Sequence, residues 1–461
     1  MRSTPSSPRT LLAALALALP LLAACGGGMA SSNVGAVPTP MPAASSAGGT
    51  VAVEAPAMMA VATPAAAAMA PTAAAARMDG AAEPAAAVGM AATAPPASSA
   101  PQPTPAPVTS QQQYTPLRAG EVDDNADFDS YLAYVQRSAG IRARQADVSE
   151  RYLLSVADAA GRPVLDARVR IFDGPQQVFE GRTFAGGKTV FFPRVAGVSG
   201  NSQQLRVVVE KGNSSAEGAL ERGQTRPPAF VLRDAEAAPA APRLDVLFLL
   251  DATGSMGDEI GQIQQTIASI AERIDGSQPR PELRFGLVAY RDRGDAYVTQ
   301  VHDFTADVAQ FRDTLLATSA GGGGDDPESL NEGLHAAIEG VSWADNAVRL
   351  TFLVADAPPH LDYAQDYDYV QEAQAAVARG IKIYTIAASN SGDEAEYVMR
   401  QIAQQTLARF IFLTYQQGAN GGTPGDTTVH QVDPQSFSVE RLDDLVVQVV
   451  QQELAAAQGV A

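Results

Sequence analysis

The stretch VLFLLDATGSM, residues 246–256, decides the fold of this 461-residue chain. Its first five residues are all large and apolar, which predicts a strand buried on both faces, as in a parallel sheet covered by helices. The strand leads directly into a loop that carries Asp251, Thr253 and Ser255 at alternate positions. Isoleucines then recur between residues 260 and 274 at helical spacing, so a strand, a polar loop and a helix follow one another.

The same alternation of strands and helices continues to residue 457. Further strands are predicted over 285–290, 350–355, 381–387 and 410–413, and further helices over 327–340, 366–379, 393–405 and 438–457. We therefore expect an α/β domain over 244–457 with a doubly wound, mostly parallel, Rossmann-like sheet. Ligands of such sheets bind at the carboxyl ends of the strands, in the loops that lead to the helices.

Two later loops of this domain also carry acidic side chains. The second loop, residues 321–328, holds Asp325 and Asp326 after four glycines and before a predicted helix. The third loop starts with Asp356, directly after the strand predicted over 350–355. Oxygen ligands drawn from three loops suit a hard cation, either Mg²⁺ or Ca²⁺. The candidate metal ligands are Asp251, Thr253, Ser255, Asp325, Asp326 and Asp356.

These loops resemble those of the von Willebrand factor A domain, whose metal-ion-dependent adhesion site (MIDAS) begins with the motif Asp-x-Ser-x-Ser. Thr253 replaces the first serine here and keeps its hydroxyl, and Asp356 stands where the family has its third-loop aspartate. The resemblance covers about residues 244–455. It implies a binding module in which a divalent metal accepts a carboxylate from a protein or peptide partner.

The second loop departs from the family pattern, because the threonine found there in the family has no counterpart. Either Asp325 or Asp326 stands in its place. A third carboxylate weakens the pull of the metal on a partner carboxylate, and it equally favours Ca²⁺, whose affinity rises with ligand charge. An acidic second loop combined with the third loop Asp-Ala-Pro-Pro-His, residues 356–360, resembles a bacterial and protist subset that includes A domains attached to some alpha-kinases. The chain carries no kinase motif.

Upstream, apolar and polar residues alternate in short segments separated by turn sequences, which predicts β-strands. Four strands are expected over 153–156, 167–172, 189–192 and 205–209. We expect a small antiparallel sandwich over 150–234, followed by a linker over 235–243. Residues 156–169 resemble a carboxypeptidase-regulatory or bacterial immunoglobulin-like (Ig-like) domain, which implies a stalk.

Residues 113–149 read as an acidic helical connector. Phe128, Tyr131, Leu132 and Val135 have the spacing of one helix face. An acidic run over 123–127 precedes this helix. Carboxylates at the positive end of the helix dipole explain it better than a calcium-binding loop does.

The N-terminal segment has the features of an export signal. Arg2 and Arg9 precede an apolar run that ends in LAACG, residues 22–26, and this ending resembles the bacterial lipoprotein lipobox. The resemblance implies a signal peptide over 1–24 and lipid attachment to Cys25, the one cysteine of the chain. Residues 25–112 are rich in Ala and Pro and poor in aromatic residues, which predicts a disordered tether.

Composition narrows the function classes. The chain has 32 Lys and Arg against 51 Asp and Glu, a net charge of −19, so it lacks the basic field that nucleic acid requires. One cysteine excludes a disulfide framework, and with four histidines a histidine-built zinc site is not expected.

We therefore expect a non-enzymatic, lipid-anchored protein of the cell envelope whose A domain binds Mg²⁺ or Ca²⁺ and, through it, a protein partner in adhesion or envelope assembly. If the host is Gram-negative, the absence of Asp after Cys25 favours the outer membrane, facing the periplasm or the surface. One alternative is a metal-independent envelope scaffold. Another is a metal-dependent hydrolase with His360 as proton carrier.

Overall fold

The computed structural model describes residues 117–226, 228–235, 241–277, 280–388, 391–414 and 440–460. The expected signal peptide, Cys25 and the tether over 25–112 lie outside these residues, as does most of the linker expected over 235–243.

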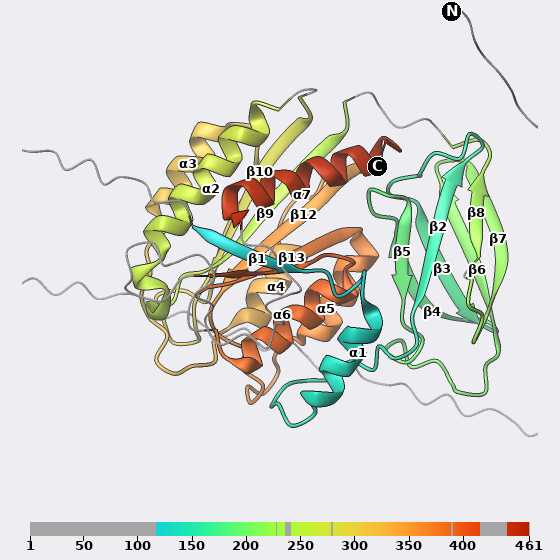
Figure 1. Ribbon diagram of the computed structural model, residues 1–461, viewed down its shortest axis with the longest axis horizontal. Coiled ribbons are helices and arrows are strands. Elements are labelled where there is room, and N and C mark those ends of the chain that lie inside the picture. The colour runs from blue at the N-terminus through green and yellow to red at the C-terminus, as the bar shows by residue number, and fades with distance from the viewer. Residues whose placement is uncertain are drawn as a thin grey trace, which may run out of the picture. The chain divides into compact units, whose positions relative to one another are not determined.

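An eight-stranded sheet forms the centre of the C-terminal half (Figure 1). Its strand order is β11-β10-β9-β12-β13-β14-β1-β15. The five strands from β10 to β14 in this order are mutually parallel, whereas β11, β1 and β15 pair antiparallel. The bounds are β9 Arg243–Asp251, β10 Glu282–Tyr290, β11 Thr299–Thr305, β12 Ala347–Ala355, β13 Ile381–Ala387, β14 Phe410–Leu413, β1 Arg118–Val122 and β15 Glu440–Arg441.

Helices cover both faces of this sheet, because alternate residues of the central strand point to opposite sides. Val246, Phe248 and Leu250 pack with one set of helices, and Leu247 and Leu249 pack with the other. The first set is α2 Ile260–Asp275, α3 Val308–Ala317 and α7 Leu442–Ala457; the second is α4 Leu330–Glu339, α5 Tyr369–Arg379 and α6 Asp393–Gln405. The prediction of a doubly wound, mostly parallel α/β fold is confirmed.

Strand β1 lies inside the segment that was expected to be only a helical connector. It pairs with β14, and Leu117 and Ala119 are buried in the same core as α2 and α7. The expected helix is also present as α1, Phe128–Arg137, with Asp127 as its N-cap. Part of the connector is therefore built into the sheet of the C-terminal domain.

The strands between residues 152 and 232 form two sheets, in the orders β5-β2-β8 and β4-β3-β6-β7, around a shared core. All pairings are antiparallel except β2–β8, so the expectation of a wholly antiparallel sandwich is wrong for that pair. The bounds are β2 Tyr152–Asp158, β3 Arg168–Asp173, β4 Gln176–Arg182, β5 Lys188–Phe191, β6 Gln204–Lys211, β7 Ser214–Glu221 and β8 Ala229–Leu232.

Two buried ion pairs link the C-terminal domain to the connector and to the sandwich. Arg400 of α6 donates to Asp124, just before α1, at 2.5 and 2.9 Å. Arg349 of β12 donates to Asp166, just before β3, at 2.9 Å. Within the described ranges, no helix has the length and apolarity needed to cross a bilayer.

Candidate functional site

The first loop begins where β9 ends, at Asp251. This carboxylate is fully buried and is held at both oxygens. Its Oδ1 accepts hydrogen bonds from the backbone N–H of Thr253 at 2.9 Å and from its hydroxyl at 2.6 Å, and its Oδ2 accepts from the Tyr290 hydroxyl at 3.1 Å. The chain then enters a 3-10 helix over Gly254–Asp258, which brings Ser255 back toward the same point.

The third loop meets the first because β9 and β12 are neighbours whose carboxyl ends lie at the same edge of the sheet. Ser255 Oγ donates to Asp356 Oδ1 at 3.1 Å. Thr253 Oγ1 and Ser255 Oγ also lie 3.1 Å apart. The structure thus brings together four of the six predicted ligands in one hydrogen-bonded chain, Asp251–Thr253–Ser255–Asp356.

In the second loop, the side chain that lies next to these four ligands is that of Glu328, which was not among the predicted ligands. It is only 3% exposed. A Cβ built on Gly323 would lie 2.6 Å from Glu328 Oε1 and 3.5 Å from Thr253 Cβ, so this carboxyl is next to the first loop. Among the described residues its Oε2 has no hydrogen-bond partner, although that atom is buried.

The backbone of Glu328 is also tied to the third loop. Its N–H donates to the Pro358 carbonyl at 2.9 Å, and its own carbonyl accepts from the His360 N–H at 3.1 Å. Its place in the sequence gives a signal for this position: it directly precedes Ser329, the N-cap of α4, and Leu330, the first buried helix residue. Asp325 and Asp326 follow the glycines farther from the helix.

Those two aspartates lie elsewhere. Asp325 is exposed, and its carboxylate groups with Asp292 and His360, whose ligand atoms all lie within 4.8 Å of one another. Asp326 is exposed and belongs to neither group.

Three carboxyl groups meet at this point, those of Asp251, Asp356 and Glu328, and we call them the inner carboxyls. Each of them has a raised pKa. Burial raises the pKa of Asp251 to about 6. Burial and then the nearby Asp251 charge raise the pKa of Asp356 to about 7. Burial, followed by the charges of Asp251, Asp292 and Asp356, raises the pKa of Glu328 to about 9. Three ionised carboxylates this close together would repel one another. A bound divalent cation would offset that repulsion with its positive charge.

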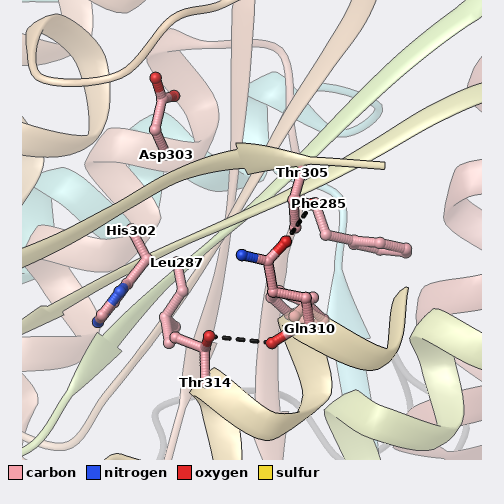
Figure 2. A pocket seen from close by; sticks show the side chains of 8 residues that line it. Phe285, Leu287, His302, Asp303, Thr305, Gln310 and Thr314 are labelled. Carbon is pink, nitrogen blue, oxygen red and sulfur yellow. Dashed lines mark hydrogen bonds between the residues drawn. The ribbon is translucent and has the colours of Figure 1, made fainter. Parts of the chain in front are cut away.

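A cavity of about 170 Å³ lies away from this cluster, between β10, β11 and α3 (Figure 2). None of the predicted ligands lines it. Figure 2 shows Gln310, one of the lining residues, bonded to two neighbours: the side-chain oxygen accepts from Thr305 at 2.8 Å and the backbone carbonyl accepts from Thr314 at 2.9 Å. Because these polar groups satisfy one another, the loop cluster is the stronger candidate site.

Known proteins are similar to part of this chain. It is 31% identical over 122 residues to alpha-protein kinase vwkA of Dictyostelium discoideum, covering 26% of this chain and 19% of that protein. It is 27% identical over 180 residues to hemicentin-2 of Mus musculus, covering 39% and 3%. The chain thus spans less than a fifth of these relatives.

Among solved structures, BatB of Bacteroides thetaiotaomicron aligns with 46% of this chain and 98% of its own, at 14% identity and a TM-score of 0.32. The match to a protein family is longer than the match to vwkA: residues 245–419 fit the von Willebrand factor A domain. That range contains most of β9, the three loops and the inner carboxyls. Residues 245–419 of this chain therefore match the von Willebrand factor A domain, the kind of module that points to protein interaction or adhesion.

Proposed function

We propose that this A domain binds one divalent cation, Mg²⁺ or Ca²⁺, and through it a protein partner. The ligands come from all three loops: Asp251, Thr253, Ser255, Glu328 and Asp356. The observation that carries the proposal is the buried Oε2 of Glu328, which has no hydrogen-bond partner among the described residues and lies near two other carboxyls. In the described part of the chain, no lysine or arginine forms an ion pair with any of these three groups.

The donor set fits a hard cation. All five side chains offer oxygen, and hydroxyl and carboxyl oxygens are the ligands that Mg²⁺ and Ca²⁺ take. When bound, the ion supplies an open coordination position that accepts a partner's oxygen, such as a carboxylate. Glu328 adds a third carboxylate, from the second loop, so it favours retention of the cation and weakens the attraction to an acidic partner.

The partner is a protein in adhesion or envelope assembly, and the chain acts by binding rather than by catalysis. The lipobox-like ending at Cys25 and the Ala/Pro-rich composition over 25–112 support a lipid anchor and a spacer that hold the A domain away from the membrane of the cell envelope.

The test is calorimetric titration of the full-length chain with MgCl₂ and CaCl₂. We expect saturable binding of one ion, lost in Asp251→Ala and retained in the matched control Asp326→Asn. Unchanged binding in Asp251→Ala contradicts the site.

Partner recovery from envelope extracts, with and without a chelator, then tests the role of the ion. Recovery that depends on the ion and on Asp251 supports capture through the metal. Recovery indifferent to both identifies a metal-independent scaffold instead.

A further inference from the structure

A second group of metal-ligand atoms lies beside the oxygen cluster. Asp292 follows β10, Asp325 belongs to the second loop and His360 ends the third loop; their ligand atoms lie within 4.8 Å of one another. Asp292 and His360 are 6% and 4% exposed, whereas Asp325 is exposed. The group therefore has a buried floor and one side open to solvent.

The imidazole of His360 has the hydrogen-bond pattern of a metal ligand. Its Nδ1 lies 2.9 Å from a carboxylate oxygen of Asp362, which only accepts, so Nδ1 carries a proton. Its Nε2 is buried, has no hydrogen-bond partner in the described part of the chain, and faces Asp292 Oδ1 at 3.5 Å. Histidines that bind metals typically donate their other N–H to a carboxylate in this way, which leaves a lone pair directed at the ion.

Neighbouring side chains hold two of these groups in place. The Tyr363 ring stacks on the His360 ring, with centroids 3.9 Å apart. The Tyr363 hydroxyl lies 2.9 Å from both oxygens of Asp292, and the Ser329 hydroxyl donates to Asp292 Oδ1 at 2.9 Å. The buried floor of the group is therefore ordered without an ion.

We propose that Asp292, Asp325 and His360 form a second metal site that takes a divalent transition-metal ion, with Zn²⁺ as its representative. An imidazole nitrogen with two carboxylates suits zinc and its neighbours rather than Mg²⁺ or Ca²⁺. Three protein ligands leave a fourth position open, on the side of exposed Asp325. The two sites have separate ligands and take different classes of ion, so this site does not depend on the proposed function.

The test uses the full-length chain and two probes, Zn²⁺ by calorimetry and Co²⁺ by its visible absorption. We expect one Zn²⁺ to bind, with absorption from bound Co²⁺. Both signals should be lost in His360→Gln and in Asp325→Asn, whose exposed side chain makes misfolding a poor explanation. Asp362→Asn, which changes only the partner of Nδ1, should weaken Zn²⁺ binding on the order of 10–100-fold. His302→Gln, on β11, is the matched control and should bind like the parent chain.

Two comparisons decide the outcome. Zn²⁺ binding that survives both Asp325→Asn and His360→Gln, or that is absent from the parent chain, overturns the proposal. Asp251→Ala should lose Mg²⁺ and Ca²⁺ binding and keep Zn²⁺ binding, with the reverse in Asp325→Asn. Loss of Zn²⁺ in Asp251→Ala means that there is one site rather than two, and it also overturns the proposal.

Discussion

Asp166 and Arg349 form a buried ion pair between the β-sandwich and the A domain. Arg349 Nη1 lies 2.9 Å from Asp166 Oδ1, and the two side chains are 4% and 2% exposed. Asp166 Oδ2 also accepts from the backbone N–H of Asn346, and Arg182 lies 3.1 Å from Asp166 Oδ1. Burial by itself would raise the pKa of Asp166, but the positive charges of Arg349 and Lys211 hold it below its ordinary value.

Removing one partner of this pair should destabilise the protein. We expect Asp166→Ala to lower the free energy of unfolding by about 3–5 kcal/mol, because Arg349 then loses the counterion that is buried beside it and keeps only the exposed Asp345 at 3.8 Å. Urea unfolding followed by circular dichroism measures the loss. The control is Glu217→Ala, which removes an exposed pair with Arg206 and should cost about 0–1 kcal/mol. Equal losses of unfolding free energy in the two variants would show that the buried pair stabilises the protein no more than an exposed pair does.

Changing Glu328 should separate cation binding from stability. Glu328→Gln keeps the shape of the side chain and removes its charge. We expect affinity for Ca²⁺ to fall by on the order of tenfold or more, since affinity follows ligand charge. The cation-free chain should melt at a higher temperature, because a crowded carboxyl has been removed. Calorimetry and thermal melts in chelator measure the two effects, with Asp326→Asn as control; a variant that binds Ca²⁺ as tightly as the parent excludes Glu328 as a ligand.

The inner carboxyls predict how the stability of the cation-free chain depends on pH. Asp251, Asp356 and Glu328 have folded-state pKa values of about 6, 7 and 9, against ordinary values of 3.8, 3.8 and 4.5. The folded chain therefore holds more protons than the unfolded chain between these limits, and their contribution to stability is lost as the pH rises.

The melting temperature in chelator should accordingly fall from about pH 5 to about pH 9. Saturating Ca²⁺ should flatten this decline, because cation binding replaces the protons. Melts at stepped pH, with and without Ca²⁺, check both statements. A melting temperature that rises with pH in chelator contradicts the assignment of these shifts.

A fragment of residues 244–461 should be less stable than one that starts at residue 113. Without β1, the hydrogen-bonding edge of β14 loses its partner, and the apolar surface covered by Leu117 and Ala119 is uncovered. Size-exclusion chromatography and thermal melts of the two fragments test this. Equal melting temperatures and equally monomeric elution would mean that β1 is dispensable.

The elements that local pattern predicts are those buried on one or two faces. The continuous apolar run of β9 and the isoleucine spacing of α2 predicted both elements. This works because burial alone dictates which residue types such elements carry. Strand β1 has the sequence RAGEV, whose polar residues suggest a loop, and it becomes a strand only through β14, almost 300 residues later. Pairing at that distance leaves no local signal.

The site shows the same limit. That Asp251, Thr253, Ser255 and Asp356 would lie close together could be predicted, since each stands at the end of a recognisable strand or shortly after it. Within the second loop, composition does not distinguish Asp325 from Glu328. The path of the chain across four glycines leaves Asp325 exposed to solvent and Glu328 buried. Gly322 and Gly323 both have positive φ, and that backbone geometry is not encoded in the acidic residues themselves.

The two backbone hydrogen bonds between Glu328 and the third loop have an entropic consequence. Because the Glu328 N–H donates to Pro358 and the His360 N–H donates to Glu328, the second and third loops are ordered together when the chain folds. An arriving ion then meets ligands whose backbone freedom has already been lost, so less of its binding free energy is offset by ordering the loops.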